Sequence, residues 1–239
     1  MTPQRNLKHW FLQILSCLLL FTFNNLNAQK KSSIDENTEY EITMIKEGLV
    51  DVSTIDASIK VQLKYATSDN FIHFNVYGNL HKAFLQPEVA KRLAKAQQAL
   101  KLEHPELSLV IFDAARPYRV QCLMWQRLNQ PEKKKHLYLA DPKIGSLHNF
   151  GCAVDLSIVD KDGKELDMGT PFDFFGEKAY PIREKKMLAK GILNTAQIKN
   201  RDLLRKYMFA AGFDGTTTEW WHFNACSRNA AKLKYRIIP

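Results

Sequence analysis

The segment from Cys152 to Val159 constrains the fold more than any other part of the sequence. Val154, Leu156 and Ile158 alternate with small or polar residues, which is the period-two pattern of a half-buried strand. The four residues that follow, Asp160 to Gly163, read DKDG and are typical of a hairpin turn. A strand that turns directly back predicts an antiparallel sheet.

Helical patterns are interspersed with strand-like segments along the rest of the chain. One helix is expected to begin at Pro87 and end before His104, and a second to begin at Pro117 and end by Pro131. A third is expected to be capped by Thr195 and to end at Gly212. Further strands are expected at 59–64, 107–112 and 218–224. The hairpin signals favour an α+β fold, a single domain with a mainly antiparallel central sheet flanked by helices. A mixed sheet is the alternative.

The first 28 residues have the three parts of an export signal peptide. Arg5 and Lys8 precede an apolar stretch of about 14 residues, 10–23, and Ala28 provides a small residue for cleavage. A membrane anchor would need about 20 apolar residues, and a lipoprotein using Cys17 is disfavoured because the apolar run continues beyond it. The sequence thus predicts a periplasmic or secreted protein without stable membrane insertion, with residues 29–54 as a polar lead-in and 55–239 as one folded domain.

Charge and cysteine content exclude several classes of protein. The export signal contributes two basic residues and no acidic one, so the net charge falls from +9 in the full chain to about +7 in the 211 residues that remain. This is modest for a nucleic-acid-binding protein, and the cluster 133–136 contains no aromatic residue, so we expect a solvated loop there and no nucleic-acid partner. Cys122, Cys152 and Cys226 form at most one pair and have no CxxC spacing, so a disulfide framework and a cysteine zinc site are excluded. Neither the oligomeric state nor the pairing of these cysteines follows from the sequence.

Two short motifs contain residues suited to a metal. His148 and Asp155 flank the start of the alternating strand, and Gly151 between them indicates a tight bend. His222 belongs to the tetrapeptide EWWH, which begins at Glu219. Two histidines and one carboxylate suit catalytic zinc, with the fourth position left for water. The alternatives are a hydrogen-bonded Asp155 at a strand edge and a tetrapeptide whose tryptophans simply pack the core.

Glu219 and Arg116 are candidates for the chemistry itself. Glu219 and His222 are three residues apart, so a regular strand would place them on opposite faces, and a bend at Glu219 is required if both are to reach one site. Glu219 would then act as general base. Arg116 follows a predicted strand, where its guanidinium could stabilise an oxyanion; a surface salt bridge with Asp113 is the alternative.

Five ordered motifs give the chain a resemblance to the zinc D-alanyl-D-alanine dipeptidases of the VanX type, in peptidase family M15. The motifs are Lys64-Tyr-Ala-Thr67 with Asn70-Phe71, Asp113-Ala-Ala-Arg116-Pro117, Ser146-x-His148-x-x-Gly151-x-Ala153-x-Asp155, Met168-Gly-Thr-Pro-Phe-Asp173 and Glu219-Trp-Trp-His222. They span nearly all of the sequence after the export signal. The chain departs from the family at Ala115, where relatives often have tyrosine, and at Cys152, an oxidisable neighbour of a ligand.

The resemblance implies a D,D-peptidase/Hedgehog-like fold and a complete set of site residues. It implies one Zn²⁺ per chain on His148, Asp155 and His222, with Glu219 as catalytic base, Arg116 stabilising the transition state, and Tyr65, Asp113, Ser146 and Asp173 lining the substrate pocket. Asp173 resembles the carboxylate that receives the substrate's ammonium group. The expected reaction is hydrolysis of D-Ala-D-Ala, a small dipeptide, to two D-alanines. The alternatives are a related D,D-carboxypeptidase or endopeptidase acting on peptidoglycan stem peptides, and a secreted binding module without turnover.

Overall fold

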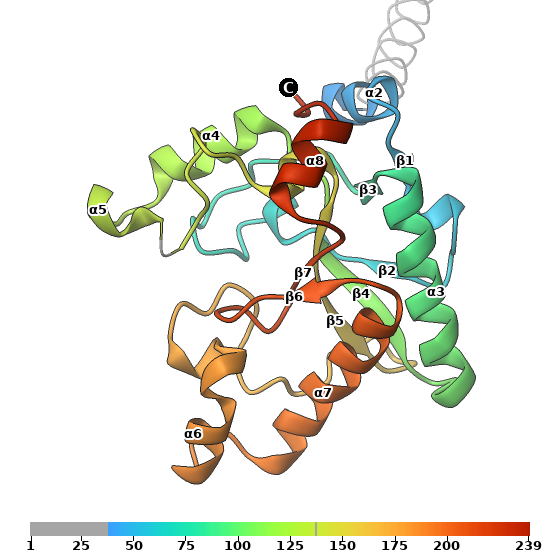
Figure 1. The fold of residues 1–239 in the computed structure, drawn as a ribbon, viewed down its shortest axis with the longest axis vertical. Coiled ribbons are helices and arrows are strands. Elements are labelled where there is room, and N and C mark those ends of the chain that lie inside the picture. The colour runs from blue at the N-terminus through green and yellow to red at the C-terminus, as the bar shows by residue number, and fades with distance from the viewer. Residues whose placement is uncertain (1–37, 137) are drawn as a thin grey trace, which may run out of the picture. The chain divides into compact units, whose positions relative to one another are not determined.

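The structure is a computed structural model that describes residues 38–136 and 138–239. The expected signal peptide and residues 29–37 of the expected lead-in lie outside the described residues. Residues Tyr40–Pro239 form one compact unit, shown in Figure 1. Its first half contains α2 (Glu39–Lys46), β1 (Val50–Asp51), β2 (Lys60–Val61), β3 (Phe84–Leu85), α3 (Pro87–Glu103), β4 (Ser108–Asp113), α4 (Tyr118–Arg127) and α5 (Glu132–Lys135). Its second half contains β5 (Ala153–Val159), α6 (Glu184–Ala189), α7 (Thr195–Ala210), β6 (Asp214–Gly215), β7 (His222–Asn224) and α8 (Arg228–Lys234). Short 3₁₀ helices η1 to η5 lie at Val52–Thr54, Lys64–Ala66, Leu147–Phe150, Glu177–Ala179 and Pro181–Arg183.

The central sheet has five strands in the order β2-β4-β5-β7-β6. Only the β2–β4 pair is parallel, and β4–β5, β5–β7 and β7–β6 are antiparallel. The expected α+β fold with a mainly antiparallel sheet is therefore confirmed. The expected turn at Asp160 also forms, because the chain returns through a bridge between Val159 and Glu165.

Strand β5 lies in the middle of this sheet and is buried on both faces. All seven of its residues are buried, so the expectation of a half-exposed strand was wrong. On one face Val154, Leu156 and Ile158 join the main hydrophobic core. Helices α3 and α7 contribute to the same core and pack against each other (Figure 1). On the other face Val159 joins a smaller cluster that Phe172 covers. Asp155 therefore lies on the face that does not enter the main core.

The helix predictions are confirmed with small shifts. Helix α3 begins at Pro87 and ends before His104, and α4 follows Pro117. The cap of α7 is Asn194 rather than Thr195, because the Asn194 side chain accepts a hydrogen bond from the backbone N–H of Gln197 at 2.9 Å.

Other expectations about the extent of the elements need correction. The folded part begins well before residue 55, because α2 and the turns after it bury Met44, Leu49 and Val52. The lysines at 133–135 lie in the short helix α5 rather than in a loop. The strands expected at 59–64 and 218–224 reduce to β2 and β7, since a strand needs a paired neighbour that the alternation alone does not provide. Helix α8 was not foreseen.

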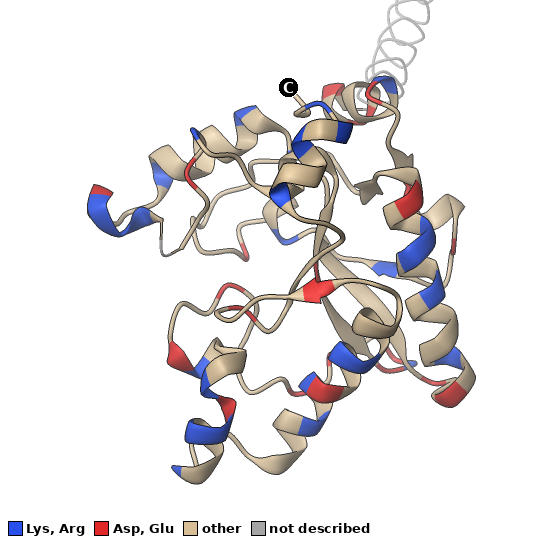
Figure 2. Cartoon of the chain, in the orientation of Figure 1, with Lys and Arg blue, Asp and Glu red and all other residues tan. Residues whose placement is uncertain are grey.

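Lys and Arg residues are distributed over α3, α5, α6, α7 and α8, with Asp and Glu among them (Figure 2).

Within the described part of the chain, no helix combines the length and the apolar character needed to cross a membrane.

Candidate metal centre and substrate pocket

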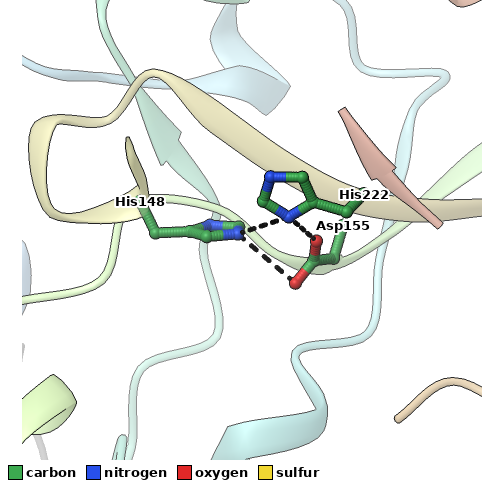
Figure 3. A group of neighbouring side chains, drawn as sticks. All are labelled: His148, Asp155 and His222. Atoms are coloured by element: carbon green, nitrogen blue, oxygen red, sulfur yellow. Dashed lines mark hydrogen bonds and ion pairs between the residues drawn. The ribbon is translucent and has the colours of Figure 1, made fainter. Parts of the chain in front are cut away.

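His148, Asp155 and His222 meet at one point (Figure 3). His148 Nε2 lies 3.3 Å from His222 Nδ1 and 3.4 Å from Asp155 Oδ2. The other carboxylate oxygen, Oδ1, lies 2.9 Å from His222 Nδ1. One potential ligand atom from each residue falls within 4.8 Å of the others, so the three side chains that the sequence singled out are brought together.

The register of the sheet explains how two of these residues meet. Asp155 on β5 lies directly opposite His222 on β7 in the antiparallel pairing, and directly opposed side chains share one face of a sheet. Asp155 is 4% exposed. Burial alone would raise the pKa of its carboxyl, but His148 and His222 lower that pKa more, so the group is held ionised.

His148 is positioned by the 3₁₀ helix η3 just before β5. The Ser146 hydroxyl accepts a hydrogen bond from the His148 N–H at 3.3 Å, and the Ser146 N–H donates to Asn149 Oδ1 at 2.8 Å, forming a capping box. Gly151 then ends η3 in the left-handed region with φ of 64°, as the sequence indicated. The bend turns the His148 ring towards Asp155.

Hydrogen bonds on the far side of each imidazole fix which nitrogen faces the cluster. His148 Nδ1 lies 2.7 Å from the carbonyl oxygen of Ala114, and because a carbonyl only accepts, Nδ1 carries the proton and Nε2 presents a lone pair. His222 Nε2 likewise donates to Asn224 Oδ1 at 2.8 Å, so Nδ1 faces the cluster.

Two nitrogen lone pairs and a carboxylate at such short range require a cation between them. In the metal-free protein the proton takes that role: burial lowers the pKa of His222, but its hydrogen bond to Asp155 and the charge of Asp155 raise it more, to about 9. The donor set fits a divalent metal of borderline softness. The chemistry of these three residues is therefore that of a metal centre.

Glu219 lies beside the cluster but is not part of it. It precedes β7, so it is free of the strand geometry that would turn it away from His222, and the chain bends at 217–218 and turns at 220–221 on either side of it. Glu219 Oε2 lies 3.8 Å from His222 Nδ1. Burial raises the pKa of the Glu219 carboxyl, His222 opposes that effect, and the charge of Asp155 adds to it, for a net increase. A carboxylate with a raised pKa beside a metal centre is suited to accept a proton.

Arg116 is buried rather than at the surface. Its Nε donates to Asp113 Oδ2 at 2.9 Å and its Nη1 donates to Gln121 Oε1 at 2.8 Å. Asp113 is fully buried and also accepts a hydrogen bond from the Tyr77 hydroxyl at 2.6 Å. Burial opposes the charge of Arg116, but Asp113 raises the pKa of the guanidinium further, so it stays cationic. The salt bridge with Asp113 that was the alternative for Arg116 does form, but as a buried ion pair rather than at the surface.

Asp113 needs a correction, because it does not line the pocket. Its carboxylate is already occupied by Arg116, Tyr77 and the backbone N–H of Ala114. It positions Arg116 instead of contacting a ligand.

Asp173 is held in an unfavourable state. Its backbone has φ of 59°, the left-handed region that non-glycine residues rarely adopt. Oδ1 accepts a hydrogen bond from the Tyr65 hydroxyl at 3.0 Å, whereas Oδ2 is buried without a partner among the described residues. Burial and the charge of Asp155 raise the pKa of this carboxyl well above its usual range. Strain and an unsatisfied buried oxygen together make Asp173 a candidate functional residue.

These side chains surround a cavity of about 270 Å³. Of the expected residues, the cavity is lined by Tyr65, Arg116, Ser146, His148, Asp155, Asp173, Glu219 and His222. It is also lined by residues that the sequence did not single out: His136, Tyr138, Leu139, Ala140, Thr218, Trp221 and Arg228. These come mainly from irregular segments, in which no periodic pattern indicates which side chains face inward.

Comparisons with known proteins agree with this geometry. Residues 45–237 match the model of the family Peptidase_M15, described as D-ala-D-ala dipeptidase. The chain is 34% identical to a D-alanyl-D-alanine dipeptidase of Escherichia coli K12 over 175 residues, which cover 73% of this chain and 83% of the relative. It is 32% identical over 193 residues to a D-alanyl-D-alanine dipeptidase of Enterococcus faecium, covering 74% and 90% of the two chains.

Proposed function

Because the chain belongs to the Peptidase_M15 family of D-Ala-D-Ala dipeptidases, we propose that it hydrolyses the free dipeptide D-Ala-D-Ala to two molecules of D-alanine. Family membership supports peptide hydrolysis. The lining of the pocket supports the choice of a free dipeptide over a longer chain.

We propose zinc as the metal, one ion per chain on His148, Asp155 and His222. Two imidazoles and one carboxylate are a common ligand set of catalytic zinc sites, which keep a fourth position open. When bound, the ion would supply Lewis-acid activation of a water molecule and of the peptide carbonyl. The hydrogen bonds from His148 to Ala114 and from His222 to Asn224 orient these ligands before the ion binds.

The observation that carries the substrate assignment is the unpartnered Oδ2 of Asp173. A free ammonium group donates up to three hydrogen bonds, so it can satisfy this oxygen, and its positive charge favours the ionised form of a carboxyl whose pKa burial otherwise raises. An acylated nitrogen has one N–H and no charge, and it would leave Asp173 buried and unpaired. A charge-assisted hydrogen bond of this kind contributes roughly 1.5–3 kcal/mol, or about 10–150-fold in rate.

Glu219 and Arg116 divide the chemical work. Glu219 takes a proton from the attacking water while the oxygen of that water bonds to the carbonyl carbon of the peptide. It then gives that proton to the leaving amine as the C–N bond breaks. Arg116 has five N–H donors, of which three are engaged by Asp113 and Gln121. The two that remain are available to stabilise the oxyanion.

The test compares kcat/KM of the zinc-loaded protein for D-Ala-D-Ala, L-Ala-L-Ala, N-acetyl-D-Ala-D-Ala and a stem pentapeptide that ends in D-Ala-D-Ala. We expect efficient cleavage of the free D,D-dipeptide alone. The variant Asp173→Asn keeps the shape of the side chain and removes its charge. It should therefore lower kcat/KM most for the free dipeptide, and so reduce the difference in kcat/KM between the free and the acetylated dipeptide. Equal rates on the free and acetylated dipeptides would refute the dipeptidase assignment and favour the carboxypeptidase alternative.

We also propose that the protein is exported, with cleavage after Ala28. The charged start, short apolar stretch and small residue before the cleavage point support this. N-terminal sequencing of the protein recovered from a periplasmic or culture fraction of a bacterial host should begin at Gln29. Recovery of the uncut chain in the cytoplasm would contradict export.

A further inference from the structure

The residues that line the cavity come from different parts of the chain. Asp173 belongs to the segment between β5 and η4, and Thr218 and Glu219 to the segment between β6 and β7, whereas 138–140 and Arg228 belong to the connection after α5 and to the start of α8. Figure 1 shows α5 and α8 above β7, and the segment that leads into α6 below it. The residue assigned to the ammonium group and Arg228 therefore come from different segments that line the same cavity.

Only one of the two arginines that line the cavity has its charge already balanced. Arg116 is buried and ion-paired with Asp113. Arg228 is exposed, and among the described residues its guanidinium has no ion-pair or hydrogen-bond partner. On the same helix, Lys234 pairs with Glu88. The Arg228 side chain thus presents a cation to the cavity that no group within residues 38–136 and 138–239 neutralises.

We propose that Arg228 binds the C-terminal carboxylate of the substrate, and so determines specificity at the end of the dipeptide remote from Asp173. The inference rests on the proposed function and adds the second charged contact of the same pocket.

The dimensions and charges of a dipeptide fit this arrangement. An extended dipeptide spans about 7 Å from end to end, so its ammonium and carboxylate groups need separate receptors. Asp155, Asp173 and Glu219 line the cavity, and these acidic groups repel a substrate carboxylate. The Arg228 guanidinium, which comes from a different segment than Asp173, offers a carboxylate two parallel N–H donors. Charge complementarity therefore orients the dipeptide with its C-terminus towards α8.

The test pairs a dipeptide with its C-terminal amide, which removes only the negative charge. For the unmutated enzyme, kcat/KM should be higher for D-Ala-D-Ala than for D-Ala-D-Ala-NH₂. In Arg228→Gln, kcat/KM for the free acid should fall about 5- to 20-fold, chiefly through KM, because a charge-assisted hydrogen bond in a solvent-accessible site is lost. The kcat/KM for the amide should change little, so the ratio of kcat/KM for the acid to that for the amide should fall towards one. Arg228→Lys should restore part of the ratio.

Lys232→Gln is the matched control. Lys232 is an exposed cation on the same helix and does not line the cavity, so it reports the effect of removing one charge from α8 without removing the contact. We expect it to leave the ratio unchanged. An equal loss for acid and amide in Arg228→Gln, or no loss at all, would overturn the inference while the proposed function stands. Failure of the unmutated enzyme to cleave D-Ala-D-Ala would instead refute the proposed function and the inference with it.

Binding gives a second readout that does not depend on turnover. In a Glu219→Gln background, calorimetric titration with D-Ala-D-Ala should show weaker binding when Arg228→Gln is added, by the same 5- to 20-fold. An unchanged Kd would overturn the assignment of Arg228 as a carboxylate receptor.

Discussion

Gly151→Ala tests the link between the fold and the metal centre. Gly151 has φ of 64°, and a Cβ added there would lie 2.8 Å from Leu49 Cδ2 and 3.3 Å from the backbone nitrogen of Gln86. The left-handed conformation costs a residue with a Cβ about 1–2 kcal/mol, and overpacking of a buried site adds about 1–3 kcal/mol. We therefore expect a loss of about 2–5 kcal/mol in the free energy of unfolding, or about 4–20 °C in Tm for a domain of this size.

Gly163→Ala separates these two costs. Gly163 has φ of 80°, and nothing lies within 4 Å of a Cβ added there, so this variant has the conformational cost alone. Urea unfolding of the metal-free variants, followed by the fluorescence of the buried Trp220 and Trp221, should show that Gly151→Ala is less stable than Gly163→Ala by about 1–3 kcal/mol. Zinc affinity should fall only in Gly151→Ala, because that bend aims His148. Equal stability of the two variants would refute the steric reasoning.

Three further predictions concern the metal centre. Glu219→Gln should retain zinc yet lose about 10²–10⁴-fold in turnover, as expected for a general base; metal analysis beside kinetics checks this, and loss of zinc would make Glu219 a ligand. Zinc binding must displace the proton that His222 holds with a pKa of about 9. Zinc affinity measured by chelator competition should therefore rise about tenfold per pH unit from about pH 6.5 to 8.5, and an affinity that does not change with pH would contradict the role of His222 as a ligand. The double variant Cys152→Ser, Cys226→Ser should keep its zinc, because burial and the neighbouring Cys226 raise the pKa of the Cys152 thiol and prevent formation of the thiolate that a metal requires.

Residue type and spacing indicated His148, Asp155 and His222 as candidate metal ligands, and the family resemblance supplied the rest of the candidate site. A buried carboxylate on the polar face of a strand needs a partner, and the two motifs each contain a histidine that could provide one. Strands β4 and β5 and helices α3 and α4 could be predicted for a similar reason, since apolar spacing directly reflects burial.

Features that depend on contacts distant in the sequence could not be predicted. The pairing of Asp155 with His222 depends on the register between β5 and β7, which no local pattern encodes. The positive φ of Asp173 and the orientation of Arg228 depend on how irregular segments fold back over the sheet. The length of β7 was overestimated because the residues before it are apolar for packing reasons.

The position of Asp155 and His222 on adjacent inner strands has a consequence for how the protein opens and closes. Amide groups in the middle of a sheet exchange with solvent only when much of the domain unfolds, whereas irregular segments exchange through small local fluctuations. Amides at 153–156 and 222–224 should therefore be among the slowest to exchange, and those at 168–176 and 138–145 among the fastest. An ion held as proposed by Asp155 and His222 would then remain bound while the irregular segments around the cavity move. Sequence changes in those segments would alter which peptide enters without loosening the proposed ligands.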